Sequence, residues 1–168
     1  GTGVIATVTA VTAITNALAA LPATGGTLYF PHGTYLVSST LALKDKRNIV
    51  FQGASLADRV ADTQSSTLQY TASSGSLLTY EGAVGITTRG LALVYSHAAY
   101  ASVLLNLDQG TGAQNTSEIL FEHCRIGGTS TSSKAATVLL QCAELVYDIT
   151  IQHCKFLNGA IAIQGSTI

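Results

Sequence analysis

The sequence predicts an all-β fold, a right-handed single-stranded parallel β-helix with a short capping helix at its N-terminus. A short segment recurs at a shift of about thirty positions, and apolar residues alternate within each copy as they do in strands with one buried face. The composition agrees with this fold. Only 10% of the residues are charged whereas 47% are hydrophobic, so most side chains must pack inside a fold that offers little surface.

The first segment with helical periodicity runs from Val11 to Leu21 and ends at Pro22 and the Gly25-Gly26 pair. Its predicted apolar face consists of Ala13, Ile14, Ala17, Leu18 and Leu21. Such a helix is expected to cover the apolar end of the first coil, which would otherwise face water. We therefore predict an N-terminal strand and capping helix at residues 1–24 and β-helix coils at residues 25–168.

The repeated segment occurs at residues 48–53, 85–93, 118–126 and 148–156. In the last two copies His123-Cys124 aligns with His153-Cys154. The parity of the apolar residues changes at this pair, which predicts two short strands joined by a bend. Further apolar runs predict a third strand in each coil, at residues 102–108, 137–142 and 160–164.

Equivalent residues of successive coils are expected to stack about 4.8 Å apart, which places Ile119 over Ile149 and Cys124 over Cys154. Segments rich in Ser, Thr and Gly predict loops at residues 54–67, 72–76 and 127–133. A bare end of a β-helix exposes apolar side chains and unpaired backbone groups. Because residues 161–164 begin one more strand, we expect the series of coils to be truncated at its C-terminal end.

The start of the coil region resembles the pectate lyase-like β-helix superfamily, which includes phage tailspikes and related depolymerases. In that family a short helix is followed by a Gly-Gly pair, a Phe-Pro-x-Gly-x-Tyr strand and turn, and then the first coil. Here Gly25-Gly26, the segment from Phe30 to Tyr35 and the segment from Asn48 to Gly53 occur in the same order. The family's repeat commonly has Asn before the Cys at the bend, where this chain has His123 and His153.

The resemblance implies a polysaccharide-binding segment of a phage tailspike or depolymerase that acts on bacterial surface glycans. It also implies a place on a virion tail or outside the cell, and assembly as a homotrimer. A non-catalytic structural or adhesive stalk and a secreted pectate-type lyase are the alternatives, because one fold serves many functions. The reaction of the complete protein therefore stays open between glycoside hydrolysis, lyase chemistry and none.

Charge and hydropathy narrow the range of partners. The net charge is −1 and charge runs are absent, which disfavours nucleic acid as a partner. No apolar run is long enough to predict membrane insertion. We expect no cofactor.

Glycosidic hydrolysis requires two carboxyl groups, and three acidic side chains lie within the repeats: Glu118, Glu122 and Asp148. Their parity points them outward, with Glu118 over Asp148, so that the two could share a proton as a general acid. A solvated edge of the coils is the alternative. Arg125 and Lys155 are predicted to stack outward as a cationic stripe for acidic sugars, the alternative being an ordinary ion pair with Glu122.

Aromatic side chains commonly bind sugars, and Tyr95, His97 and Tyr100 are predicted to form a glycan-contact patch in the loop-rich middle of the chain. His123 and His153 are expected to face inward and fill the corner of the coil, so no metal site is predicted. The three cysteines are expected to be inert thiols in apolar rows.

Overall fold

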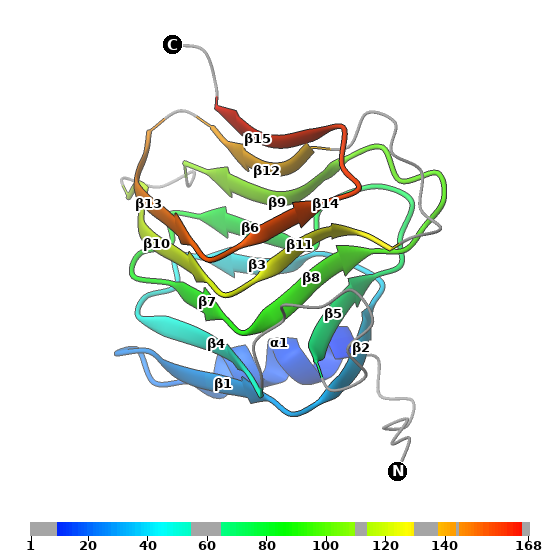
Figure 1. Ribbon diagram of the computed structural model, residues 1–168. Coiled ribbons are helices and arrows are strands. Elements are labelled where there is room, and N and C mark those ends of the chain that lie inside the picture. Colours follow the sequence, from blue (N-terminus) through cyan, green and yellow to red (C-terminus); the bar gives the residue numbers. More distant parts are fainter. Residues whose placement is uncertain (1–9, 55–64, 110–113, 130–137, 144, 166–168) are drawn as a thin grey trace.

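The computed structural model describes residues 10–54, 65–109, 114–129, 138–143 and 145–165. These residues form a right-handed parallel β-helix preceded by helix α1 (Ala10–Ala20), as predicted (Figure 1). The strands are β1 (Gly26–Phe30), β2 (Gly33–Val37), β3 (Leu41–Lys44), β4 (Ile49–Gly53), β5 (Ser66–Tyr70), β6 (Leu78–Glu81), β7 (Thr87–Arg89), β8 (Leu91–Tyr95), β9 (Val103–Asp108), β10 (Thr116–Glu122), β11 (Arg125–Gly128), β12 (Val138–Cys142), β13 (Val146–Gln152), β14 (Lys155–Leu157) and β15 (Ile161–Gly165).

The strands form three parallel sheets, because each coil contributes one strand to each sheet (Figure 1). The first sheet has the order β1-β4-β7-β10-β13, the second β2-β5-β8-β11-β14, and the third β3-β6-β9-β12-β15. Backbone hydrogen bonds therefore run from one coil to the next, and every third strand in the chain lies beside its equivalent.

Helix α1 lies at the N-terminal end of the β-helix, where it contacts β2 and β3 (Figure 1). Ile14 and Leu18 are its buried residues. Ala13 and Ala17, which the periodicity placed on the same face, are exposed. The helix is rotated so that its remaining core contacts come from Ala10, Val11 and the following Leu21. The predicted strand before the helix lies outside the described residues.

Rows of like side chains fill the interior. Ile119 pairs with Ile149 in the first sheet, as the repeat predicted. In the third sheet one row of aliphatic side chains crosses all five coils and consists of Leu41, Leu78, Leu105, Leu140 and Ile163. The continuity of these rows explains why a chain with so few charged residues folds into strands that have one face turned inward.

Two of the predicted loops are partly strand. Strand β5 begins at Ser66, inside the segment 54–67, and the buried Ser66 hydroxyl donates to the Phe30 carbonyl at 2.7 Å. Gly127 and Gly128 belong to β11, and a Cβ on Gly127 would lie 1.8 Å from the Leu157 carbonyl oxygen. Local composition indicated loops here, whereas pairing with neighbouring coils determines the structure.

The last described coil is more exposed than the others. In β15 the side chains of Ile161 and Ile163 are 44% and 50% exposed, whereas Leu140, which lies beneath Ile163, is fully buried. No helix among the described residues has the length and apolar character needed to cross a membrane.

Candidate functional site

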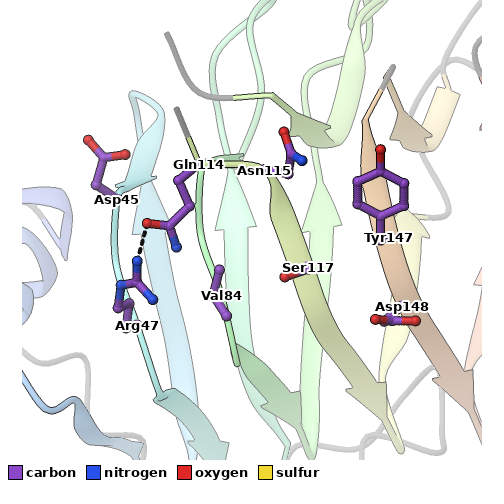
Figure 2. A pocket seen from close by; sticks show the side chains of 8 residues that line it. All are labelled: Asp45, Arg47, Val84, Gln114, Asn115, Ser117, Tyr147 and Asp148. Carbon is purple, nitrogen blue, oxygen red and sulfur yellow. Dashed lines mark hydrogen bonds between the residues drawn. The ribbon is translucent and has the colours of Figure 1, made fainter. Parts of the chain in front are cut away.

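An open groove of about 800 Å³ lies where the chain turns from the third sheet into the first (Figure 2). It is lined by Asp45, Arg47, Val84, Gln114, Asn115, Ser117, Tyr147 and Asp148. These residues come from four successive coils, so the groove exists only because the coils stack.

One row of residues forms the floor of the groove. Arg47 pairs with Val84, Val84 with Ser117, and Ser117 with Tyr147, each in parallel register. The row therefore runs along the axis of the β-helix, across the strands rather than along them. Over four coils its length is about 14 Å, given the spacing between strands.

The groove carries hydrogen-bonding groups of mixed charge. The Arg47 guanidinium donates to the side-chain carbonyl of Gln114, and this hydrogen bond holds the two groove-lining side chains together (Figure 2). Asp45 and Asp148 contribute carboxylates, and the ring of Tyr147 is 48% exposed. A hydroxyl-rich ligand would find donors, acceptors and one aromatic face here.

A column of left-handed residues adjoins this row. Asn48, Gly85, Glu118 and Asp148, which we call the groove bend, each follow a residue of the row and have φ between 52° and 69°. Left-handed backbone interrupts the usual inward and outward alternation of side chains. The direction of the side chains therefore has to be determined separately before and after the bend. Glu118 and Asp148 are both exposed.

A second left-handed column lies at the opposite end of the strands of the first sheet. It consists of Gly90 (φ 65°), His123 (φ 50°) and His153 (φ 53°), which we call the histidine bend. The two imidazole rings stack with centroids 4.7 Å apart and planes 9° from parallel. His153 is exposed and His123 half-buried, so the prediction that they face inward is wrong. Counting parity across a left-handed residue gave the wrong side.

A family model described as rhamnogalacturonase A/epimerase, pectate lyase-like, matches residues 8–167. The chain belongs to this family. The match confirms the resemblance inferred from the repeats, and it associates this pectate lyase-like chain with polysaccharide-related β-helices. Neither the curated proteins nor the solved structures include a match.

The three acidic candidates of this pectate lyase-like chain separate into two places. Glu118 and Asp148 lie on neighbouring coils of the groove bend, between register pairs that align them, and Asp148 lines the groove. Glu122 lies at the far end of β10, where its Oε1 accepts a hydrogen bond of 3.0 Å from the Gln152 side-chain amide. Glu122 therefore belongs to the surroundings of the histidine bend.

The proposed patch of Tyr95, His97 and Tyr100 is not a surface platform. Tyr95 and Tyr100 are 0% exposed, and their rings stack 4.8 Å apart inside the core. The Tyr100 hydroxyl donates to the carbonyls of Gly75 and Val103, at 2.6 and 2.8 Å. A tyrosine hydroxyl in a loop-rich stretch suggests a surface position. The sequence does not show that backbone carbonyls inside the fold accept its hydrogen bond. His97 is exposed.

Arg125 and Lys155 occupy equivalent positions of β11 and β14, in direct register. Lys155 is exposed, whereas Arg125 is half-buried, and this burial lowers the pKa of its guanidinium. The pair lies on the second sheet and does not line the groove. A glycan-binding role for these two cations stays a prediction.

The cysteines differ from one another. Burial raises the pKa of Cys142. The pKa of Cys124 is also raised, because its thiol donates a hydrogen bond to Cys154 and because it is buried. The same hydrogen bond lowers the pKa of Cys154 to about 7, because it stabilises the Cys154 thiolate. Cys154 is therefore the cysteine for which the prediction of an inert thiol most needs a test.

Sequence reasoning did not find the row at the groove floor. Arg47, Val84, Ser117 and Tyr147 share no residue type, and each stands one position before the segments that were aligned as repeats. Extending the repeat alignment by one residue toward the N-terminus would have placed all four in one column.

Proposed function

We propose that the chain is a polysaccharide-binding β-helix segment of a phage tailspike or depolymerase that acts on bacterial surface glycans, and that the groove holds the glycan. The observation that carries the proposal is the row from Arg47 to Tyr147, which follows the axis of the β-helix over four coils. A linear polymer laid along this row would meet an equivalent position on every coil.

The groove chemistry fits a hydroxyl-rich polymer. Ser117, Gln114 and Asn115 offer neutral donors and acceptors, whereas Arg47, Asp45 and Asp148 offer charge-assisted hydrogen bonds. Tyr147 supplies the aromatic face on which a sugar ring can pack. The mixture of both charges favours a neutral or sparsely charged glycan over a polyanion.

The proposal includes a candidate acid. Asp148 is in the groove, and Glu118 occupies the equivalent position one coil earlier. A protonated carboxyl group at this place could transfer its proton to a glycosidic oxygen. We assign a location on a virion tail or outside the cell, and a homotrimer, as parts of the same proposal; the free cysteines among the described residues agree with assembly in a reducing cytoplasm.

The binding test compares two exposed tyrosines of the first sheet. Tyr147 lies in the groove and Tyr29, which is 60% exposed, lies outside it. We expect Tyr147→Ala to weaken binding of a bacterial surface polysaccharide about tenfold, or about 1.4 kcal/mol, and Tyr29→Ala to leave it unchanged. Isothermal titration calorimetry after a panel screen measures both. Equal losses in the two variants, or no binding to any glycan of the panel, would contradict the proposal.

The reaction class is tested on the same polysaccharides. Release of reducing ends without absorbance from unsaturated uronates indicates a hydrolase, and such absorbance indicates a lyase. If reducing ends alone appear, Asp148→Asn is expected to abolish them. Binding without either product supports the adhesive stalk, which uses the same groove without chemistry.

A further inference from the structure

The histidine bend places two imidazoles and one carboxylate together on the outside of the coils. Glu122 is the last residue of β10, His123 follows it, and His153 occupies the equivalent position of the next coil. Their ligand atoms lie within 4.8 Å of one another. This cluster lies outside the groove and shares no residue with it.

The carboxylate of the cluster is held in place. Glu122 pairs in register with Gln152, whose side-chain Nε2 donates to Glu122 Oε1 at 3.0 Å. One oxygen of Glu122 is thereby oriented by a neutral donor, and the other can accept a cation. Such hydrogen bonds to a ligating group are typical supports of metal sites. On the opposite side Arg89 is in register with Glu122, and its Nε donates to the side chain of Gln52.

The two imidazoles are arranged by the coil repeat. Because His123 and His153 lie on adjacent coils, their backbones are held one strand spacing apart, and their rings face each other at 4.7 Å. Zinc–nitrogen bonds are about 2.0–2.1 Å long, so modest rotation of both rings would direct one nitrogen of each toward a shared ion. The exposed bend leaves room for water to complete the coordination.

The position also bears backbone cost. A left-handed residue other than Gly costs about 1–2 kcal/mol, and the preceding coil uses Gly90 at this place. Two successive histidines keep the costly conformation. Strain of this kind commonly marks functional positions.

We propose that Glu122, His123 and His153 form a binding site for a divalent transition-metal ion, and that this ion is Zn²⁺. Two imidazole nitrogens and a carboxylate oxygen suit Zn²⁺, Cu²⁺ or Ni²⁺, whereas Ca²⁺ and Mg²⁺ prefer oxygen ligands alone. The bound ion would join the coil of β10 and β11 to the coil of β13 and β14. It would therefore stabilise the more exposed end of the described β-helix.

The test is zinc titration of the chelator-treated full chain by isothermal titration calorimetry, with thermal unfolding followed in parallel. We expect one Zn²⁺ per chain and a rise of a few degrees in the unfolding temperature, tighter binding of Cu²⁺, and no competition by Ca²⁺. His123→Asn, His153→Asn and Glu122→Gln should each weaken zinc binding at least about tenfold and remove the thermal shift. Asn adopts left-handed backbone readily, so the histidine variants preserve the bend.

The matched control is His32→Asn, which changes an exposed histidine outside the cluster. It should leave zinc affinity and the thermal shift unchanged. Circular dichroism checks that each variant is folded. If a histidine variant is not folded, His153→Gly is used in its place, because glycine adopts the left-handed backbone without steric cost. An equal loss in His32→Asn, or full zinc affinity in His153→Asn, would overturn the proposal. Glycan binding does not involve these residues, so failure of this proposal and failure of the glycan proposal are distinguishable.

Discussion

The strands of the first sheet lie between two bends that require the same backbone conformation and achieve it with different residues. At the groove bend the earlier coils use Asn48 and Gly85 and the later coils Glu118 and Asp148. At the histidine bend Gly90 is followed by the two histidines. Gly adopts positive φ without steric cost, Asn, Asp and His adopt it more often than other residues, and Glu adopts it at a larger cost. In both columns, therefore, the later coils have a residue with an outward side chain where an earlier coil has glycine, and they accept a backbone cost that glycine avoids.

The comparison teaches that backbone position fixes where a side chain projects and leaves its chemistry open. The groove bend adjoins a row of mixed side chains, for which we propose a hydroxyl-rich polymer, and the histidine bend gathers nitrogen and oxygen atoms, for which we propose a metal ion. Two ends of the same strands can thus serve different ligands. Three kinds of change test the difference between the two bends. They concern the glycines beside the bends, the thiol that follows His153, and the left-handed acidic residues of the groove bend.

The largest effect is expected from Gly53→Ala, compared with Gly85→Ala. A Cβ on Gly53 would lie 1.9 Å from the Gly90 carbonyl oxygen, so the backbone of the histidine bend would have to move. A Cβ on Gly85 would lie 2.6 Å from the Asn48 side-chain oxygen, which can rotate away. We expect losses in the free energy of unfolding of about 3 kcal/mol or more for Gly53→Ala and about 1–2 kcal/mol for Gly85→Ala, the latter from its φ of 69°.

Urea denaturation measures both variants under the same conditions. Equal destabilisation would mean that the close approach of Gly53 to the neighbouring coil costs no more than the left-handed backbone at Gly85 does. The comparison of the two bends would then lose its structural basis.

A smaller effect is expected for the thiols. The Cys124 thiol lowers the pKa of Cys154, which follows His153, to about 7, whereas burial raises the pKa of Cys142. Below pH 7 Cys154 is mainly protonated, and above it mainly the reactive thiolate. In metal-free buffer at pH 7 we expect iodoacetamide to modify Cys154 about tenfold faster than Cys142, since the lower intrinsic nucleophilicity of a low-pKa thiolate offsets part of its greater abundance.

Mass spectrometry of peptides after timed alkylation gives both rates. Cys124→Ala tests the cause, because removing the donor beside Cys154 should shift the rise of its alkylation rate to higher pH. A Cys154 rate that is equal to the Cys142 rate at every pH would refute the assignment.

The sequence was sufficient for the parts of the fold that depend on periodicity. Alternation and the repeat predicted the row of Ile119 and Ile149, and counting back one residue from these inward side chains gave the outward direction of Glu118 and Asp148. Left-handed residues interrupt that count. The inward direction predicted for His123 and His153 is therefore wrong, and the expectation of no metal site rested on that direction.

Other features depend on contacts between coils that local patterns do not contain. All five residues of β8 are buried, so no alternation indicated that Tyr95 points into the core. The groove row joins a basic, an apolar, a hydroxyl and an aromatic side chain, and only the register of neighbouring coils reveals it. Core rows repeat residue types and are visible in one sequence, whereas the groove row varies from coil to coil.

The smallest expected effect concerns the strained acids of the groove bend. Glu118 (φ 57°) and Asp148 (φ 53°) occupy equivalent positions, yet Asp and Asn tolerate left-handed backbone better than Glu does. Glu118→Asn should therefore raise the free energy of unfolding by about 0.5–1 kcal/mol, whereas Asp148→Asn should leave it nearly unchanged. Urea denaturation distinguishes the two. If Glu118→Asn is neutral or destabilising, the Glu118 carboxylate contributes a stabilising interaction that offsets its backbone strain, and the later coils would not be carrying strain for function alone.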